Sequence, residues 1–399
     1  MNVTVRGRAR QYRTVSFDAD SNRVLLIEQR LLPHQFAIVQ ARDFRQTARA
    51  ITDMVVRGAG AIGATAAYGL AQGARAFRGR HLKAFSRHVE GVYQTLKSAR
   101  PTAVDPVNAM NHVRAAMQPG QTVEEQQQLA VAAAEHFANE DVRHCRDIGR
   151  HGARLVRNGM NVLTHCNAGW LAFVDIGSAT APLYAAHEQG KAFHVFCDET
   201  RPRSQGATLT AWELAQQGIS HQVIADSAAG HLMQRGRIDL VIVGSDRTLG
   251  RTGEVANKIG TYSKAVLAHR HGIPFYVAIP LSTIDWSLKS GAAIPIEERD
   301  ESEVLGAWGV VADPRGKGSP SRPLTSREFG AVLKNQPSSA SPTRSPRRVY
   351  VRVANATSHA ANPGFDVTPP ELITGIITAQ GIFKPRELWP HRRQLGWHV

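Results

Sequence analysis

The sequence predicts an α/β protein whose C-terminal part is built on a parallel sheet and whose N-terminal part is mainly helical. Two patterns lead to this prediction. Apolar residues recur at helical spacing through residues 1–150, and short apolar runs alternate with helix-like segments from about residue 160. With 399 residues, 42% of them hydrophobic, the chain can form one large or two ordinary domains. We expect a helical domain at 1–150 and a sheet domain at 151–399.

The helical prediction for the first part comes from two long segments. They read "TARAITDMVVRGAGAIGATAAYGLAQGARAF" and "VEEQQQLAVAAAEHFANEDVRHCRDIGRHGARLV". Each places apolar side chains on one face of a helix, and the many alanines and glycines suit close packing between helices. We therefore expect this part to be mainly helical.

Five short apolar runs predict the strands of the second part: "MNVLTHC", "KAFHVFCDE", "SHQVIADS", "IDLVIVGSD" and "IPFYVAIP". Alternation with helix-like segments indicates parallel strands joined by helical crossovers, as in Rossmann-like domains. Ligands of open α/β sheets bind in the crevice beyond the carboxyl ends of the strands. The residues at these ends are therefore candidates for a functional site: Cys166, Asp198, Asp226, Asp246 and Pro280.

Local sequence separates these candidates into two groups. Asp198 and Asp226 each precede a helix-like segment and are expected to act as helix caps, or, for Asp198, to pair with Arg201. Cys166 and Asp246 are not followed by a helix start and could project into the crevice. A single cysteine is also commonly an inert core residue, so local sequence leaves both interpretations of Cys166 open.

The net charge of +15 raises the question of nucleic-acid binding. Residues 313–348 contain eight Lys or Arg and two Asp or Glu, so this stretch alone contributes six of the fifteen charges. It is rich in Ser, Pro and Arg, and no aromatic residues alternate with the basic ones as a base-stacking surface requires. We interpret 313–350 as a disordered insertion and expect no nucleic-acid partner.

Composition also limits the cofactors and the location of the protein. The three cysteines lack metal-type spacing, so neither a zinc site nor a disulfide framework is predicted. The sequence has no apolar run of membrane-spanning length and no secretion-signal pattern at "MNVTVRGRAR". We expect a cytoplasmic protein without a membrane partner.

Several segments, in order along the chain, resemble the methylthioribose-1-phosphate isomerase family of methionine salvage. They are "VRGAGAIGATAAYGL", "ARPTAV", "LTHCNAG", "DETRPRSQGATLTAWEL", "VIVGSDRT", "EVANKIGTYSKAVLAHRHGIPFYVA", "LSTIDWSLKSG", "IPIEER" and "NPGFDVTPPELITGIIT". Ordered matches over residues 57–378 are far more specific than a lone glycine motif. The related regulatory subunits of the translation-initiation exchange factor share this fold without being enzymes, so the fold alone does not decide the function.

The resemblance implies roles for particular residues. By their match to the family, Cys166 and Asp246 are the catalytic pair. The residues expected to bind the substrate and its phosphate are Arg57, Gly58, Ala59, Arg100, Gln205, Asn257 and Lys258. An arginine before a helix N-terminus suits this role, because free backbone N–H groups and a guanidinium together bind anions.

The reaction implied is an aldose–ketose isomerisation of 5-methylthioribose 1-phosphate to 5-methylthioribulose 1-phosphate, without a cofactor. Asp246 would protonate the ring oxygen and then manage the protons of the sugar oxygens, and Cys166 would be a base at C2 or a polar stabiliser. Strand alternation predicts that His165 faces away from the side of Cys166, and Trp170, Leu171 and Phe173 are expected to make the neighbourhood apolar. This setting favours direct hydride transfer over an enediolate.

Some positions depart from the family pattern, notably Gly60, where a proline is usual. The alternatives are therefore a related 1-phosphopentose, such as 5-deoxyribose 1-phosphate or ribose 1,5-bisphosphate, and a non-catalytic regulatory protein that binds a sugar phosphate. The sequence shows no added motif for a second phosphate, which favours a small apolar 5-substituent. The resemblance also implies a homodimer.

Overall fold

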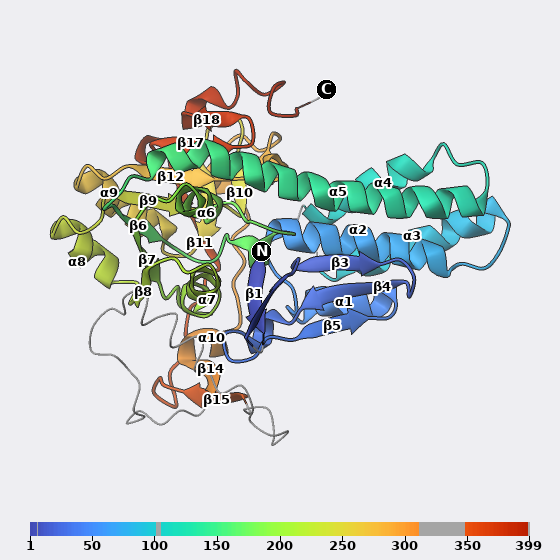
Figure 1. Cartoon of the computed structure of the whole chain (residues 1–399), viewed down its shortest axis with the longest axis horizontal. Helices are drawn as coiled ribbons and strands as arrows, with labels where there is room; N and C mark the ends of the chain where they lie inside the picture. The colour runs from blue at the N-terminus through green and yellow to red at the C-terminus, as the bar shows by residue number, and fades with distance from the viewer. Residues whose placement is uncertain (6, 101–104, 311–347, 398–399) are drawn as a thin grey trace.

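The computed structural model describes residues 1–5, 7–100, 105–310 and 348–397. Within these residues, the main sheet of the protein has seven strands (Figure 1). Its order is β18-β17-β12-β9-β6-β7-β8, and all neighbours are parallel except β17 and β18. The strands are β6 (Asn161–Thr164), β7 (His194–Asp198), β8 (His221–Ile224), β9 (Leu240–Val243), β12 (Phe275–Ala278), β17 (Gly375–Thr378) and β18 (Gly381–Phe383). The predicted α/β class and all five predicted parallel strands are confirmed.

Short helices and a second sheet surround this main sheet. The helices are α6 (Ala181–Glu188), α7 (Ala211–Gln216), α8 (Ala228–Gln234) and α9 (Thr261–Arg270). The second sheet has the order β13-β10-β11-β16, with β13 (Ile284–Asp285), β10 (Arg247–Leu249), β11 (Val255–Lys258) and β16 (Phe365–Thr368). It begins just after β9, so the carboxyl end of a central strand passes directly into a second layer.

Among its described residues, the N-terminal part holds five α-helices and five short strands. The helices are α1 (Phe44–Thr52), α2 (Ala59–Ala76), α3 (Leu82–Ser98), α4 (Asp105–Met117) and α5 (Val123–Gly152). The strands, which sequence analysis did not anticipate, are β1 (Asn2–Val5), β2 (Arg8–Gln11), β3 (Val15–Asp18), β4 (Arg23–Ile27) and β5 (Ile38–Ala41). They pair as two small antiparallel sheets, β1-β2 and β3-β4-β5.

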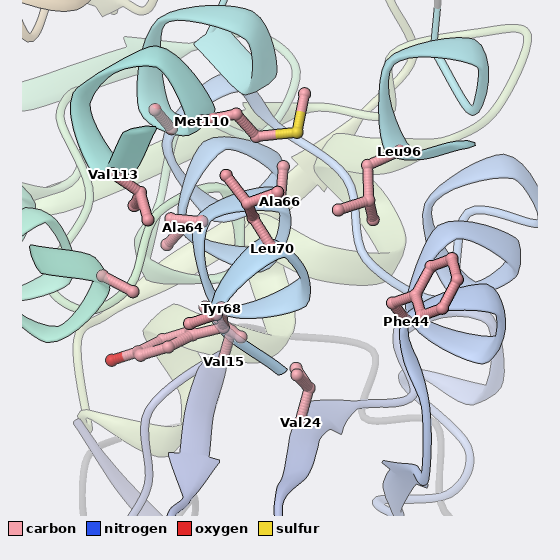
Figure 2. Packing of buried hydrophobic residues seen from close by; sticks show 14 of the residues in the cluster. Val15, Val24, Phe44, Ala64, Ala66, Tyr68, Leu70, Leu96, Met110 and Val113 are labelled. Carbon is pink, nitrogen blue, oxygen red and sulfur yellow. The ribbon is translucent and has the colours of Figure 1, made fainter. Parts of the chain in front are cut away.

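Helix α2 is the centre of the N-terminal core. Fifteen of its eighteen residues are buried, which its alanines and glycines permit because small side chains let neighbouring helices approach closely. Figure 2 shows side chains of α2 packed between the other helices and the strands β3 and β4. The labelled residues are Val15, Val24, Phe44, Ala64, Ala66, Tyr68, Leu70, Leu96, Met110 and Val113.

Helix α5 connects the two parts of the molecule, running from the helical core to the main sheet (Figure 1). It begins with a capping box, in which the Thr122 side chain accepts from the Glu125 backbone N–H and the Glu125 side chain accepts from the Thr122 backbone N–H. Helix α5 ends at Gly152, two residues beyond the expected domain boundary at 150. The boundary itself stays a prediction. None of the described helices is long and apolar enough to cross a membrane.

The predicted insertion at 313–350 lies largely outside the described residues. Only residues 348–350 are described, at the start of β15 (Arg348–Arg352). This strand pairs in antiparallel fashion with β14 (Gly306–Val310), which follows α10 (Ser302–Leu305). The insertion therefore connects the two strands of one hairpin.

Close packing explains the unusual Gly60 near the start of α2, and it predicts the effect of a larger residue. A Cβ at Gly60 would lie 2.6 Å from both Asp141 Oδ1 and Phe173 Cδ1. Both neighbours are buried, so we expect Gly60→Ala to lower the free energy of unfolding by about 1–3 kcal/mol. Thermal denaturation measures the effect.

The matched control is Gly91→Ala on α3, where an added Cβ meets no atom within 4 Å. Because alanine is favoured over glycine inside a helix by roughly 0.5–1 kcal/mol, this variant should be slightly stabilised. Equal melting temperatures for the two variants would contradict the packing argument.

Candidate active site

A cavity of about 410 Å³ lies between the start of α2 and the carboxyl ends of the strands. Its wall draws on distant parts of the chain, because the helical part supplies one side and the two sheets supply the other. All nine residues named from the sequence line it: Arg57, Gly58, Ala59, Arg100, Cys166, Gln205, Asp246, Asn257 and Lys258. Their roles remain proposals, but the fold brings them together.

One side of the cavity is the N-terminus of α2. Gly58 has a φ of 87°, and a Cβ there would lie 2.5 Å from Ala172, so only glycine fits this approach. The Arg57 guanidinium donates to the side-chain oxygen of Asn167 and, at 2.7 Å, to its backbone carbonyl. A helix N-terminus beside a guanidinium held in place makes an anion-binding site.

Lys258, Asn257 and Arg100 add polar groups to the cavity. The Lys258 ammonium donates to the Gly364 carbonyl at 2.9 Å, and Asn257 donates to the Thr261 hydroxyl at 3.0 Å. Burial lowers the pKa of Arg100 because desolvation penalises its charged form. Arg57, Lys258 and Arg100 therefore place positive charge in a poorly solvated cavity.

Three further arginines line the cavity that sequence analysis did not identify, and each is paired with an acid. Arg203 contacts Glu303 at 2.7 Å, Arg247 contacts Asp285 at 3.3 Å, and Arg299 contacts Glu303 at 2.7 Å. All three lie in segments that match the family, but sequence analysis assigned them no role, since the sequence does not show which acid each arginine pairs with. Their charge is already compensated within the protein.

Cys166 follows β6 in a strained backbone conformation, with a φ of 65°. Two hydroxyl groups hold this backbone: Thr200 accepts from the Cys166 N–H at 2.8 Å, and Thr210 donates to the Cys166 carbonyl at 2.7 Å. The thiol donates to Gln205 Oε1, with 3.3 Å between sulfur and oxygen. Burial raises the pKa of Cys166, although Arg57 and Lys258 oppose the shift, so the sulfur is a neutral donor rather than a thiolate.

The residues after Cys166 are fixed by a buried carboxyl group. Glu213 accepts hydrogen bonds from the Asn167 side chain at 2.8 Å and from the backbone N–H groups of Trp170 and Leu171. Desolvation raises the pKa of Glu213 to about 7. Glu213 thus supports both the loop that carries Cys166 and the Asn167 side chain that accepts from Arg57.

Asp246 occupies the turn between β9 and β10, where its backbone N–H donates to the Ala256 carbonyl at 3.0 Å. Burial raises its pKa, and Lys258 and Arg57 partly oppose the shift. A second carboxyl group, Asp105 at the start of α4, also lines the cavity, and burial raises its pKa to about 6. These environments favour protonated carboxyl groups, which suit general acid catalysis.

Asp198 does not pair with Arg201 as expected. Its Oδ2 lies 2.8 Å from His165 Nδ1 and 3.2 Å from the Lys264 ammonium, whereas the Arg201 guanidinium donates to backbone carbonyls. Nor does Asp226 cap a helix, since it accepts from the backbone N–H groups of Thr200 and Arg201. These partners lie on other elements, among them helix α9 for Lys264, so local spacing could not reveal them.

The orientation expected for His165 stays a prediction. Both His165 and Cys166 line the cavity, but the His165 ring bonds to Asp198 and Ile259 whereas the Cys166 thiol bonds to Gln205. Of the three apolar residues expected nearby, Phe173 lines the cavity, whereas Trp170 and Leu171 are buried in the core. Other apolar wall residues come from separate elements: Met54, Ile62, Ile294, Ile296 and Phe365.

Comparisons with known proteins agree on one family. The family model described as "Initiation factor 2 subunit family" matches residues 55–385. A curated methylthioribose-1-phosphate isomerase from Methylobacterium nodulans is 45% identical, with 96% of this chain and 98% of the relative covered. The crystal structure of 5-methylthioribose 1-phosphate isomerase from Pyrococcus horikoshii superposes with a TM-score of 0.80 at 38% identity, covering 97% of this chain and 96% of that chain.

A translation factor subunit is also similar in structure. A translation initiation factor eIF-2B delta subunit from A. fulgidus superposes with a TM-score of 0.77 at 35% identity, covering 97% of this chain and 100% of that chain. Similarity of fold therefore leaves two classes of protein to consider, and the residues of the cavity must decide between them.

Proposed function

The chain belongs to the initiation factor 2 subunit family and, within it, to the methylthioribose-1-phosphate isomerases, and we propose on this basis that it converts 5-methylthioribose 1-phosphate to 5-methylthioribulose 1-phosphate. The proposal makes it an aldose–ketose isomerase of methionine salvage that acts without a cofactor. Cys166 and Asp246 are its proposed catalytic residues.

The choice of substrate is supported by which cations of the cavity are paired with acids and which are not. Arg57 and Lys258 donate to neutral oxygens and keep their charge for a ligand, whereas Arg203, Arg247 and Arg299 are each paired with an acid. This provides for one phosphate rather than two. Apolar side chains complete the wall, as an uncharged methylthio group requires.

The proposed chemistry begins with ring opening, because a phosphate on C1 prevents release of a free aldehyde. Asp246 donates a proton to the ring oxygen as the bond between that oxygen and C1 breaks, which leaves a cationic C1. Hydrogen then moves from C2 to C1 with its electron pair while the O2 proton returns to the Asp246 carboxylate. One proton enters and one leaves, so the carboxyl group is restored.

Cys166 acts in this scheme as a neutral polar group beside the reacting carbons. Its raised pKa makes it a poor base at neutral pH, and both nitrogens of the neighbouring His165 ring are occupied by oxygen partners. Neither residue is well suited to remove the C2 proton. This supports hydride transfer over the enediolate route.

A panel of 1-phosphorylated pentoses tests the proposed function directly. Purified protein is incubated with 5-methylthioribose 1-phosphate, 5-deoxyribose 1-phosphate, ribose 1-phosphate and ribose 1,5-bisphosphate, and ketose formation is followed by NMR. We expect the highest kcat/KM with the methylthio sugar. Preference for another sugar would change the substrate, and no turnover of any sugar would favour a non-catalytic binding protein.

Replacement of Arg57 tests the phosphate site. Phosphate is present in both the ground state and the transition state, so its binding is largely uniform. We expect Arg57→Ala to raise KM about 10- to 100-fold, as loss of a charged hydrogen bond worth about 1.5–3 kcal/mol implies, with kcat changed only a few-fold. Steady-state kinetics measure both constants.

The companion variant Arg57→Lys keeps the charge but loses the two-pronged contact with Asn167. It should raise KM less than Arg57→Ala does. A collapse of kcat in both variants with KM unchanged would instead place Arg57 in the chemical step.

Turnover in D₂O tests the route that the hydrogen takes. Direct hydride transfer between C2 and C1 never exposes the hydrogen to solvent, so the ketose should contain little deuterium at C1. Proton NMR of the product measures this content. Substantial deuterium at C1 would overturn the hydride proposal and assign a base to C2.

The family resemblance extends the proposal to a homodimer in the cytoplasm. Light scattering of the purified protein gives the mass in solution, and fractionation of the source cells gives the location. A monomer with full activity would remove the dimer from the proposal without affecting the chemistry.

A further inference from the structure

The His165 side chain makes two hydrogen bonds, one from each ring nitrogen, to different parts of the chain. Nδ1 lies 2.8 Å from Asp198 Oδ2, at the end of β7, and Nε2 lies 2.9 Å from the Ile259 carbonyl, just after β11. His165 is only 1% exposed and Asp198 is fully buried. Water therefore does not compete for these contacts.

The partners determine which nitrogens carry hydrogen. A backbone carbonyl can only accept, so Nε2 must be protonated. Asp198 Oδ2 also forms an ion pair with the Lys264 ammonium, at 3.2 Å, and an ammonium that has only donors to offer pairs with an ionised carboxylate rather than with a carboxylic O–H. Nδ1 must then donate to Asp198 as well, and the ring carries a proton on each nitrogen.

We propose that His165 is a positioning residue, a buried imidazolium that ties the end of β6 to β7 and to the turn after β11 and so sets Cys166 and Lys258 at their working separation. His165 directly precedes Cys166, and Ile259 directly follows Lys258. The link to catalysis rests on the proposed function, whereas the protonation state does not.

The surrounding charges support this assignment. His165 and Lys264 supply two positive charges, Asp198 supplies one negative charge, and Asp366 on β16 supplies another. Asp366 accepts from the backbone N–H groups of Gly260 and Tyr262 at the start of α9. With Asp226, whose carboxylate lies within 4.8 Å of His165 and Asp198, three acids face these two bases, and nearby negative charge favours a protonated ring.

A metal ion is the competing occupant, because donor atoms of His165, Asp198 and Asp226 lie within 4.8 Å of one another. The Lys264 ammonium contacts Asp198 Oδ2 at 3.2 Å, whereas Asp198 Oδ1 has no hydrogen-bond partner among the described residues. Both Asp226 oxygens accept backbone N–H groups, at 2.8 and 2.7 Å. Three of the four carboxylate oxygens thus have partners within the protein, and the Lys264 ammonium would repel a cation, which favours the imidazolium over a metal.

The strained backbone of Cys166 explains why this support is needed. A non-glycine residue with a φ of 65° costs on the order of 1–3 kcal/mol and persists only where the surroundings hold it. The Thr200 hydroxyl accepts from the Cys166 N–H, and the Thr210 hydroxyl donates to the Cys166 carbonyl. The two hydrogen bonds of the His165 side chain fix the residue that precedes Cys166. Displacements of about 1 Å at a reacting group can cost about 100-fold in rate.

The first test is NMR of the full-length protein labelled with ¹⁵N in its histidine rings. At pH 8, His165 should show two protonated ring nitrogens, and its signals should vanish in His165→Gln. His194 is the internal reference, since burial lowers its pKa and it should be neutral at this pH. A neutral His165 ring would overturn the proposal, as would displacement of its ring protons by added Zn²⁺.

The second test uses two variants that each keep one of the two bonds. The amide nitrogen of His165→Asn can reach the position of Nδ1, and that of His165→Gln can reach the position of Nε2. We expect each variant to lose about 10- to 100-fold in kcat with KM changed only a few-fold, and His165→Ala to lose more. The control His194→Gln, on β7, should keep wild-type kcat.

Alkylation of Cys166 by iodoacetamide provides a readout that does not depend on isomerase activity. Cys145 and Cys197 are fully buried, so mass spectrometry can follow Cys166 selectively. The two variants should alkylate several-fold faster than wild type, because the strained loop relaxes. Folded variants with wild-type kcat and wild-type alkylation would overturn the positioning role. Loss of the proposed function alone would leave the NMR and alkylation results intact.

Discussion

Asp246→Asn should abolish most isomerase activity, with kcat reduced about 10²- to 10⁴-fold and little change in fold. Asparagine keeps the size of the side chain and its hydrogen-bonding capacity but cannot give a proton to the ring oxygen. The raised pKa of Asp246 predicts that the protonated carboxyl group is the active form in the free enzyme. Activity of the wild type should therefore fall as the pH rises through that pKa.

Asp239→Asn is the matched control for this variant. Asp239 precedes β9 whereas Asp246 lies beyond its carboxyl end, so the two variants make the same change at opposite ends of one strand. An asparagine oxygen can still accept from the Asn161 N–H, as Asp239 does at 2.7 Å. Asp246→Asn with more than a tenth of wild-type kcat would remove Asp246 from the proton transfers.

Five of the seven strands of the main sheet were predicted, because each is a short, continuous apolar run between helix-like segments, whereas β17 and β18 were not predicted. Such runs are read reliably when both faces of a sheet are covered by other elements. Strands β1 to β5 were not predicted, because they form small sheets in which buried and exposed residues are mixed. For β2, all four residues are exposed, so no apolar pattern exists to detect.

The cavity residues named from the sequence all lie in ordered motifs. Arg57 and Lys258 were named because they match ligand-binding positions of the family. Arg203 and Arg299 also lie in matching segments, but their ion pairs with Glu303, a hundred residues from Arg203, are visible only in the structure. The contact of His165 with Ile259 likewise spans 94 residues. Partners of this kind depend on tertiary packing, which local spacing does not encode.

Replacement of Cys166 should have an effect as large as that of Asp246, and the choice of substitute reveals what the sulfur does. Cys166→Ala should lose about 10²- to 10⁴-fold in kcat if the thiol performs acid–base work. The control Cys197→Ala removes a fully buried thiol from β7 and should keep wild-type kcat. Near-full turnover by Cys166→Ala would make its thiol an inert part of the core.

Cys166→Ser separates the two roles left for the thiol. The wild-type sulfur donates to Gln205 Oε1 and, because its pKa is raised, is protonated at neutral pH. If it acts as a neutral donor, serine restores a hydrogen bond worth about 1 kcal/mol and should exceed alanine about fivefold in kcat. If it acts as a thiolate base, serine fails as badly as alanine, since a hydroxyl is a much weaker acid. We expect serine to be the better substitute for Cys166. The double variant Cys166→Ala with Asp246→Asn should have a kcat little lower than that of the poorer single variant, because both residues serve one chemical step.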